Sequence, residues 1–334
     1  MNQPFDLSVL DLAPVGSGGS AAESVRRTVA LAQLAERLGY VRHWFAEHHG
    51  MPSVASASPE VLIAHVAAHT KSIHVGAGGV MLPNHAPLRV AEAFRTLAAL
   101  HPGRIDLGLG RAGGSDERAA KVMRAFTADQ FPAMLGELMT WGGLRTLPED
   151  HPMRSLRAMP DDAALPPIWV LGSSGSSARM AAAAGMGYAF ASHFSPAPAA
   201  PVFAAYRDAF QASAQFARPH AILAVSAICA PTEAQADYLA GALDLAMVRI
   251  RKGQFTVLPS PQEAAAYVFS DEERSIVRQF RELAVVGSPQ SVRDQLETRA
   301  AQCGASEVMI VSNIHGHAER MQSYELIARA FVAA

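Results

Sequence analysis

The sequence predicts an α/β fold in which eight parallel strands close into a (β/α)8 TIM barrel, with insertions after strands 4 and 7. Apolar runs typical of buried strands alternate with helical stretches along the chain, and this alternation implies parallel strands covered by crossover helices. The 334 residues show no break in composition and no low-complexity linker. We therefore predict one barrel domain over residues 1–334 rather than an open sheet.

The first half of the chain alternates strictly between strands and helices. Ser20 and Glu23 form a capping-box pattern at the start of the first helix, and Gly39 marks its end. Ser58 followed by Pro59 is the cap-then-proline order that begins a second helix. The predicted strands are 5–12, 41–46, 73–81 and 105–109, and the predicted helices are 20–38, 59–70 and 88–100.

The second half continues the alternation and carries both insertions. The segment 115–166 has helical stretches and separates the fourth strand from the fifth, whereas 251–287 is irregular, with prolines and charges. We interpret 251–287 as a candidate mobile lid, with a solvated surface excursion as the alternative. The predicted strands are 168–171, 188–191, 221–229 and 308–311, and the predicted helices are 176–184, 199–216, 232 onward and 319–332.

Composition excludes several classes of protein. The formal net charge is -2 and there is no run of Lys or Arg, so we expect neither a nucleic-acid nor a membrane partner. The N-terminus lacks the basic and apolar regions of a signal peptide, which predicts a cytoplasmic protein. Cys229 and Cys303 have no metal-ligand spacing and form no disulfide framework, and we expect both to be small buried residues.

The strand 105–109 ends in a stretch almost free of side chains, where 110–114 reads Gly-Arg-Ala-Gly-Gly. Bare backbone N–H groups beside the Arg111 guanidinium suit a phosphate. Gly108, Gly110 and Gly113 also spell the G-x-G-x-x-G dinucleotide fingerprint, and a simple glycine turn is a further interpretation. Three βα units precede this stretch, whereas a dinucleotide fold has its fingerprint in the first βα turn. We therefore interpret it as a phosphate loop of the barrel.

Unusual residues follow other predicted strands as well. The second strand leads into Glu47, His48 and His49, which suit proton transfer or substrate binding, unless they are ordinary loop histidines. The third contains 76–79, Gly-Ala-Gly-Gly, where a flat ligand could lie against the backbone. The fifth ends in 172–177, Gly-Ser-Ser-Gly-Ser-Ser, which could complete an anion site opposite Arg111 or cap a helix.

Two histidine pairs look like metal ligands and are discounted. His65 and His69 have helical i, i+4 spacing, but Val66 stands where a zinc-protease helix has Glu. His315 and His317 follow the last strand, and we interpret them as part of a turn. We predict no metal site.

Five motifs in a fixed order point to one family. They are 44–49, 75–87 followed by Arg89 and Glu92, 103–111, 167–175 and 286–289. On these motifs the chain resembles the bacterial luciferase-like, flavin-dependent monooxygenases over nearly its whole length. The resemblance implies an FMN-binding barrel that receives reduced flavin from a separate flavin reductase. Dioxygen would add to flavin C4a, and the resulting peroxide would oxygenate a small organic substrate.

The resemblance also assigns residues. His48 matches the family's acid/base histidine beside the flavin, with Glu47 and His49 orienting it or holding the loop. Members of the family often have a non-prolyl cis peptide at the pair that matches Gly78 and Gly79. The implied cofactor-binding residues are Gly78, Gly79, Gly110, Arg111, Ala112, Gly113, Gly172, Ser173, Ser174 and Ser177.

Some properties stay open in the sequence. Gly110 stands where the luciferases have a reactive cysteine, which argues against light emission. An F420-dependent oxidoreductase of the same superfamily, or a non-catalytic flavin-binding barrel, is the alternative function. Many members of the family are dimers, so we expect a homodimer. The substrate would be shaped by the two insertions, and the sequence does not identify it.

Overall fold

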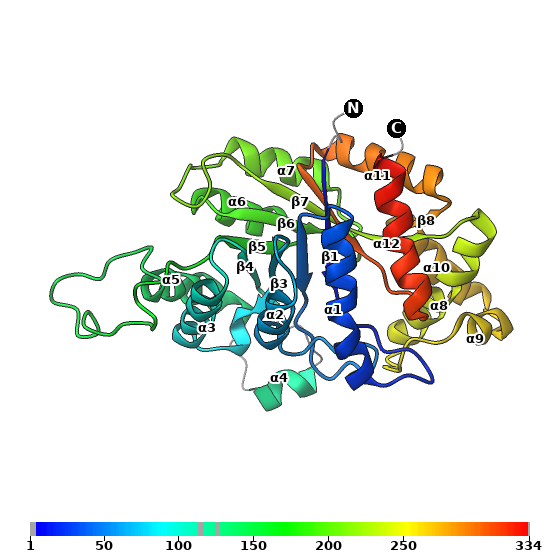
Figure 1. The fold of residues 1–334 in the computed structure, drawn as a ribbon, viewed down its shortest axis with the longest axis horizontal. Coiled ribbons are helices and arrows are strands. Elements are labelled where there is room, and N and C mark those ends of the chain that lie inside the picture. The colour runs from blue at the N-terminus through cyan, green and yellow to red at the C-terminus, as the bar shows by residue number, and fades with distance from the viewer. Residues whose placement is uncertain (1–4, 113–116, 124–126, 333–334) are drawn as a thin grey trace.

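Eight parallel strands close into a barrel at the centre of the molecule, as the sequence predicts (Figure 1). The structure is a computed structural model and describes residues 5–112, 117–123 and 127–332. The barrel runs from β1 to β7 in order and closes through β9, which pairs with both β7 and β1. Its strands are β1 Asp6–Asp11, β2 Arg42–Phe45, β3 His74–Met81, β4 Ile105–Gly110, β5 Ile168–Gly172, β6 Gly187–Ala191, β7 Ala221–Cys229 and β9 Glu307–Val311. Because all pairings are parallel, the carboxyl ends of these strands form one rim.

Helices cover the outside of the barrel and bury a continuous apolar layer against the strands. The predicted cap of the first helix is present, since Ser20 Oγ accepts a hydrogen bond from the Glu23 N–H at 3.2 Å. Within the described residues, no helix has the length and apolar character needed to cross a membrane. The covering helices are α1 Ala21–Arg37, α2 Pro59–Ala68, α3 Pro87–Leu100, α5 Phe131–Trp141, α6 Gly175–Ala183, α7 Ala199–Asp208, α8 Glu233–Arg251, α11 Pro289–Cys303 and α12 His317–Val332.

The predicted helix 199–216 is too long, because α7 ends at Asp208. Beyond Asp208, tertiary contacts hold the chain in a non-helical conformation. The backbone N–H of Gln211 bonds to the carbonyl of Ala182 at 3.0 Å, and Phe216 packs edge-on against the Trp169 ring, 5.0 Å between centroids.

The sequence interpretation also missed α11, which begins at Pro289 and ends before Gly304. Both local signals are present in the chain. Ser288 and Pro289 give the cap-then-proline start, and Gly304 has the positive φ of +65° that ends many helices.

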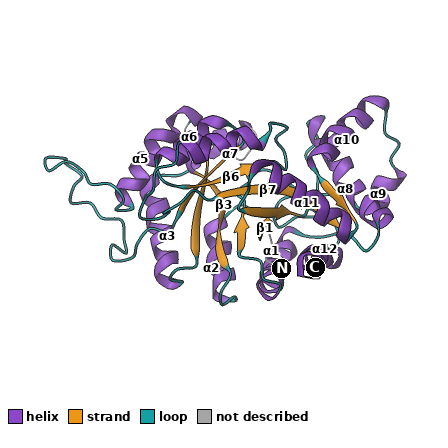
Figure 2. Ribbon diagram, turned by 90° about the horizontal axis from the view of Figure 1, so that it is seen from above, coloured by secondary structure: helices purple, strands orange, loops and turns teal. Residues whose placement is uncertain are grey.

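The insertion 251–287 is not irregular, which corrects the prediction. It forms α9 Pro261–Ala266, α10 Asp271–Leu283 and the short strand β8 Val285–Gly287, which pairs with the end of β7. Capping boxes begin both helices, Ser260 with Glu263 and Ser270 with Glu273. Figure 2 shows α8, α9 and α10 gathered on one side of the barrel, away from α3 and α5.

The insertion after β4 has the predicted helical stretches. Its described part contains α4 Glu117–Met123, a 3-10 turn at 128–130 and α5. Between α5 and β5, the chain extends away from the barrel before it returns (Figure 1).

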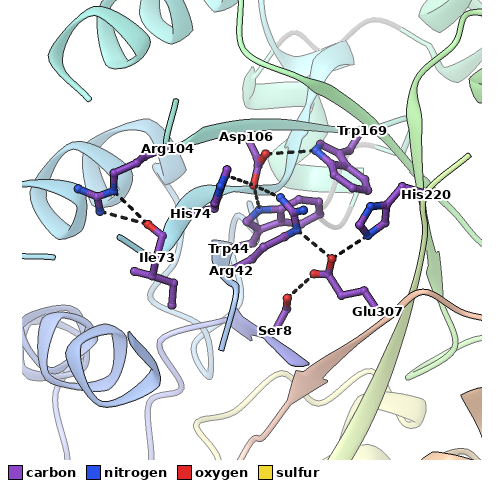
Figure 3. A network of polar contacts seen from close by, with 10 residues as sticks. All are labelled: Ser8, Arg42, Trp44, Ile73, His74, Arg104, Asp106, Trp169, His220 and Glu307. Atoms are coloured by element: carbon purple, nitrogen blue, oxygen red, sulfur yellow. Dashed lines mark hydrogen bonds and ion pairs between the residues drawn. The ribbon is translucent and has the colours of Figure 1, made fainter. Parts of the chain in front are cut away.

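The amino end of the barrel is filled by a buried network of charges that we call the floor (Figure 3). Arg42, the first residue of β2, donates to Asp106 at 2.8 Å and to Glu307 at 3.0 Å. His220 and Ser8 also donate to Glu307. Burial alone would raise the pKa of both carboxyl groups. Arg42 and the hydrogen bonds outweigh burial, and both pKa values lie below their usual range.

Two tryptophans separate this floor from the rim. Trp44 and Trp169 donate their indole N–H groups to Asp106, at 3.0 and 3.3 Å, and their rings meet edge to face. Trp44 also belongs to the apolar cluster inside the barrel. The two tryptophans therefore mark the boundary between the polar floor and the apolar interior of the barrel.

Candidate active site

A cavity of about 330 Å³, which we call the rim cavity, opens at the carboxyl end of the barrel. Its middle is apolar, with Leu10, Trp44, Met81, Leu171 and Phe190 in the wall. The structure brings most of the predicted site residues together around it. The predicted residues in its lining are His48, Gly78, Gly110, Arg111, Ala112, Gly172, Ser173, Ser174 and Ser177.

One end of the rim cavity is suited to an anion. Arg111, which directly follows β4, donates to the Ser176 hydroxyl at 3.4 Å, so it reaches the start of α6. Ser174 is the N-cap residue of α6, but its side chain makes no capping hydrogen bond. A guanidinium thus lies beside the positive end of a helix and several hydroxyl groups. Ser176 was absent from the predicted set, although it belongs to the serine-rich stretch 172–177.

The glycines of this region allow close contact between β3, β4 and the barrel interior. A Cβ on Gly78 would lie 2.7 Å from Leu10 Cδ1, and one on Gly79 would lie 2.7 Å from the Gly108 carbonyl oxygen. A Cβ on Gly108 would overlap the backbone of the neighbouring strand β3. Packing between strands therefore explains Gly108, and no dinucleotide motif is needed. Gly79 itself lies outside the cavity lining, and Gly113 and Gly114 lie outside the described residues.

The peptide bond between Gly78 and Gly79 is cis, in agreement with the expectation from the family resemblance.

His48 is the member of the 47–49 stretch that lines the rim cavity. It follows β2, and its backbone N–H bonds to the Ser56 carbonyl at 3.0 Å, which fixes the turn that presents the ring.

Glu47 is not part of the cavity lining and organises the surrounding loops. Its buried carboxylate accepts from the Met81 N–H at 2.8 Å, from His49 and His85 at 2.9 Å, and from Asn84 at 3.1 Å. Burial would raise its pKa, but the hydrogen bonds from both histidines and the attraction of His85 lower it below its usual value. Glu47 and His49 therefore hold the loops beside His48.

His193, just after β6, was not predicted and also lines the rim cavity. Burial, with a smaller contribution from the nearby His48, lowers its pKa to about 4, so the ring is neutral at physiological pH. The sequence contains a signal that could have predicted His193, because this residue closely follows the sixth strand as the other predicted residues follow theirs.

The remaining histidine pairs do not enter the cavity. His315 bonds to the Ser17 carbonyl at 2.9 Å and therefore joins two loops at the rim. His69 bonds through its ring to the His65 backbone carbonyl at 2.7 Å. No cluster of three or more potential metal ligands occurs among the residues that the structure describes.

Residues 5–307 match the family model described as luciferase-like monooxygenase. The chain belongs to this family. Curated relatives of this luciferase-like chain include a luciferase-like monooxygenase of Escherichia coli, 41% identical over 96% of this chain and 95% of the relative. N-acetyl-S-alkylcysteine monooxygenase of Bacillus subtilis is 33% identical over 98% of each chain.

Solved structures share the fold of this chain. Apo-MsnO8 is similar at a TM-score of 0.88 and 37% identity, over 99% of this luciferase-like chain and 98% of that chain. The oxygenating component of 3,6-diketocamphane monooxygenase from Pseudomonas putida, in complex with FMN, has the same fold at TM-score 0.72 and 19% identity, over 98% of each chain. The F420-dependent tetrahydromethanopterin reductase of Methanopyrus kandleri also has it, at 0.69 and 14%, over 98% of this chain and 99% of that chain.

Proposed function

We propose that this protein is an FMN-dependent monooxygenase that takes reduced flavin from a separate flavin reductase and inserts one oxygen atom of O2 into a small organic substrate. Membership of the luciferase-like family supports the reaction class. The single observation that carries the cofactor assignment is the rim cavity, which joins a cationic, serine-rich end to an apolar middle.

The donor groups of the rim cavity fit FMN. Arg111, Ser173, Ser174, Ser176 and Ser177 would hold its phosphate, together with the backbone N–H groups at the start of α6. The apolar wall would cover the flavin ring and exclude water from it. When bound in reduced form, FMN supplies the electrons that activate dioxygen.

His48 is the residue that we propose for proton transfer, since it lines the rim cavity and a neutral imidazole nitrogen can accept or return a proton near neutral pH. Glu47 and His49 would act through the loop and not on the substrate. The proposal includes a homodimer, which light scattering of the purified protein would test.

Cofactor titration and oxygen consumption test this function. We expect FMN to bind, and we expect oxygen uptake with FMN, a flavin reductase and a panel of aldehydes, thioethers and carbon substrates. His48→Ala should lower product formation by about 10²- to 10⁴-fold while FMN affinity changes little. Tight binding of F420 with none of FMN would favour the deazaflavin oxidoreductase. FMN binding without turnover on any substrate would favour a binding protein.

A further inference from the structure

A second cavity, of about 220 Å³, lies directly beside the rim cavity, and we call it the side chamber. Leu12, His48, His193 and Phe194 line both cavities and form the boundary between them. The outer wall of the side chamber comes from α8, α10 and β8. A molecule in the chamber would therefore lie next to a flavin in the rim cavity.

We propose that the side chamber binds the organic substrate, that this substrate is uncharged and largely apolar, and that it donates a hydrogen bond to the ring of His193. This assignment rests on the proposed function, because the rim cavity is taken as the flavin site.

The wall of the chamber selects for apolar ligands. Leu243 and Met247 of α8, Phe280 of α10, Ile228 of β7 and Val286 of β8 all line it. Burying apolar ligand surface against such side chains is favourable, because that surface leaves water.

The charged residues in the wall already satisfy one another. Arg281 of α10 donates through Nε to both carboxylate oxygens of Asp244, at 2.8 and 3.0 Å, and through Nη1 to Asp237 at 3.1 Å. A substrate carboxylate would have to compete with two aspartates for this guanidinium. An anion bound there without a cationic partner would lose its hydration, and no comparable interaction with the protein would offset that loss. The chamber therefore favours an uncharged ligand.

The chamber wall also holds the neutral polar residues Ser226 and Asn313 and the two boundary histidines, and we assign the polar contact with the substrate to His193. Its Nδ1 is buried and has no hydrogen-bond partner of good geometry among the described residues, while the nearby Ala224 backbone favours a proton on the ring. A neutral imidazole has one N–H and one acceptor nitrogen. We place this N–H on the buried Nδ1, beside the Ala224 backbone, so the acceptor is Nε2. We infer that Nε2 faces the boundary of the two cavities, where a ligand hydroxyl or amide N–H can reach it.

Equilibrium binding of three small probes to the full chain saturated with FMN tests this proposal. The probes are 1-hexanol, methyl pentyl ether and hexanoate. The alcohol and the ether have the same number of heavy atoms, but only the alcohol donates a hydrogen bond. From the typical net strength of one neutral hydrogen bond, we expect 1-hexanol to bind about two- to tenfold tighter than the ether. Hexanoate should bind most weakly. Ligand-observed NMR titration gives the three dissociation constants.

Two substitutions at His193 locate the hydrogen bond. His193→Phe keeps an aromatic ring and removes both nitrogens, so the preference for 1-hexanol over the ether should disappear. His193→Gln carries an amide that reaches the position of Nε2, so it should restore part of the preference.

Two substitutions on α8 locate the chamber. Leu243→Trp should fill it and weaken 1-hexanol binding at least tenfold with little change in FMN affinity. Tyr238→Trp, on the exposed side of the same helix, is the matched control and should leave binding of the probe unchanged.

The results separate this proposal from the proposed function. Equal binding of alcohol and ether by the unmodified protein, or a preference that survives His193→Phe, would overturn the role of His193. If hexanoate bound as tightly as 1-hexanol, the conclusion that the substrate is uncharged would be wrong. If Leu243→Trp left 1-hexanol binding unchanged, the side chamber would not be the binding site. If FMN does not bind, the proposed function fails, and the same three titrations on the FMN-free full chain then test the chamber separately.

Discussion

The two ends of the barrel use charged and polar groups in opposite ways. At the floor, Arg42 lies between two buried carboxylates, and the donors and acceptors are largely satisfied within the chain (Figure 3). At the rim, Arg111 is exposed, and its hydrogen-bond partner among the described residues is the neutral Ser176 hydroxyl at 3.4 Å. His193 likewise lines the rim cavity, and burial lowers its pKa to about 4, which leaves a neutral ring with one acceptor nitrogen.

This difference separates groups that hold the barrel from groups that can hold a ligand. A buried charge is tolerated when it is paired, so the floor charges need each other in the folded state. The rim groups have hydrogen-bond donors and acceptors that a ligand in the cavity can use. Substitutions at the floor should therefore change stability, and substitutions at the rim should change binding.

The largest expected effect is on the stability of the floor. Arg42→Met leaves Asp106 and Glu307 buried without their cation, and we expect the free energy of unfolding to fall by about 3–5 kcal/mol. Urea denaturation measures this change. Adding Asp106→Asn and Glu307→Gln should recover part of the loss, because no uncompensated charge is left. A loss below about 1 kcal/mol would contradict the assigned role of the floor.

The opposite result is expected at the rim. Arg111→Met removes the charge-assisted contact that we propose to the flavin phosphate, so the dissociation constant of FMN should rise about ten- to a hundredfold. The free energy of unfolding should change by less than about 0.5 kcal/mol, because Arg111 is exposed. Fluorescence titration of FMN measures the affinity. Arg27→Met, on the outer helix α1, is the control and should change neither quantity. Unchanged FMN affinity in Arg111→Met would remove the main support for the phosphate site.

The rim was largely predictable from the sequence because its signals are local. Several strands that line it, such as β4, β5 and β6, end in or are followed closely by glycine, serine, histidine or arginine, and closing the barrel brings these ends together whatever their distance in the chain. The sequence alone therefore places His48, Arg111 and Ser173 at one cavity. The same reasoning, applied to the end of the sixth strand, would also have found His193.

The floor could not be predicted in the same way. Arg42, Asp106 and Glu307 are single charged residues at the starts of apolar runs, far apart in the chain. Their contact depends on strand register, such as Ser8 opposite Arg42 and Asp6 opposite Glu307, and register is a tertiary property. The end of α7 was mispredicted for a related reason, because tertiary contacts replace the helix after Asp208.

Glu47 lies near the rim, but its buried carboxylate is satisfied by hydrogen bonds within the chain, as the carboxylates of the floor are. Its lowered pKa stabilises the fold above the ordinary value of 4.5, and this contribution is lost as pH falls through the folded value. The hydrogen bond to Glu47 raises the pKa of His85 above 6.5, and that contribution is lost as pH rises through the raised value. Glu47→Gln should therefore cost most, roughly 1–2 kcal/mol, between pH 4.5 and 6.5.

Urea denaturation of both proteins across pH measures this window. The difference in stability between the unmodified protein and Glu47→Gln should shrink on both sides of it. A difference that is constant from acid to alkaline pH would show that the Glu47–His85 pair contributes no charge interaction.

The smallest effect is expected in α10, which carries Phe280 and Arg281 to the side chamber. Ser270→Ala removes the hydroxyl that accepts from the Glu273 N–H at 3.2 Å, so it should cost about 0.5–1 kcal/mol. Because α10 packs at the periphery, the loss should appear as faster hydrogen exchange of its amides, with FMN affinity unchanged. Ser20→Ala removes the equivalent cap of α1 and should leave exchange in α10 unchanged. If Ser270→Ala weakened FMN binding as much as Arg111→Met, α10 would belong with the flavin site, and the side chamber would not be a separate substrate site.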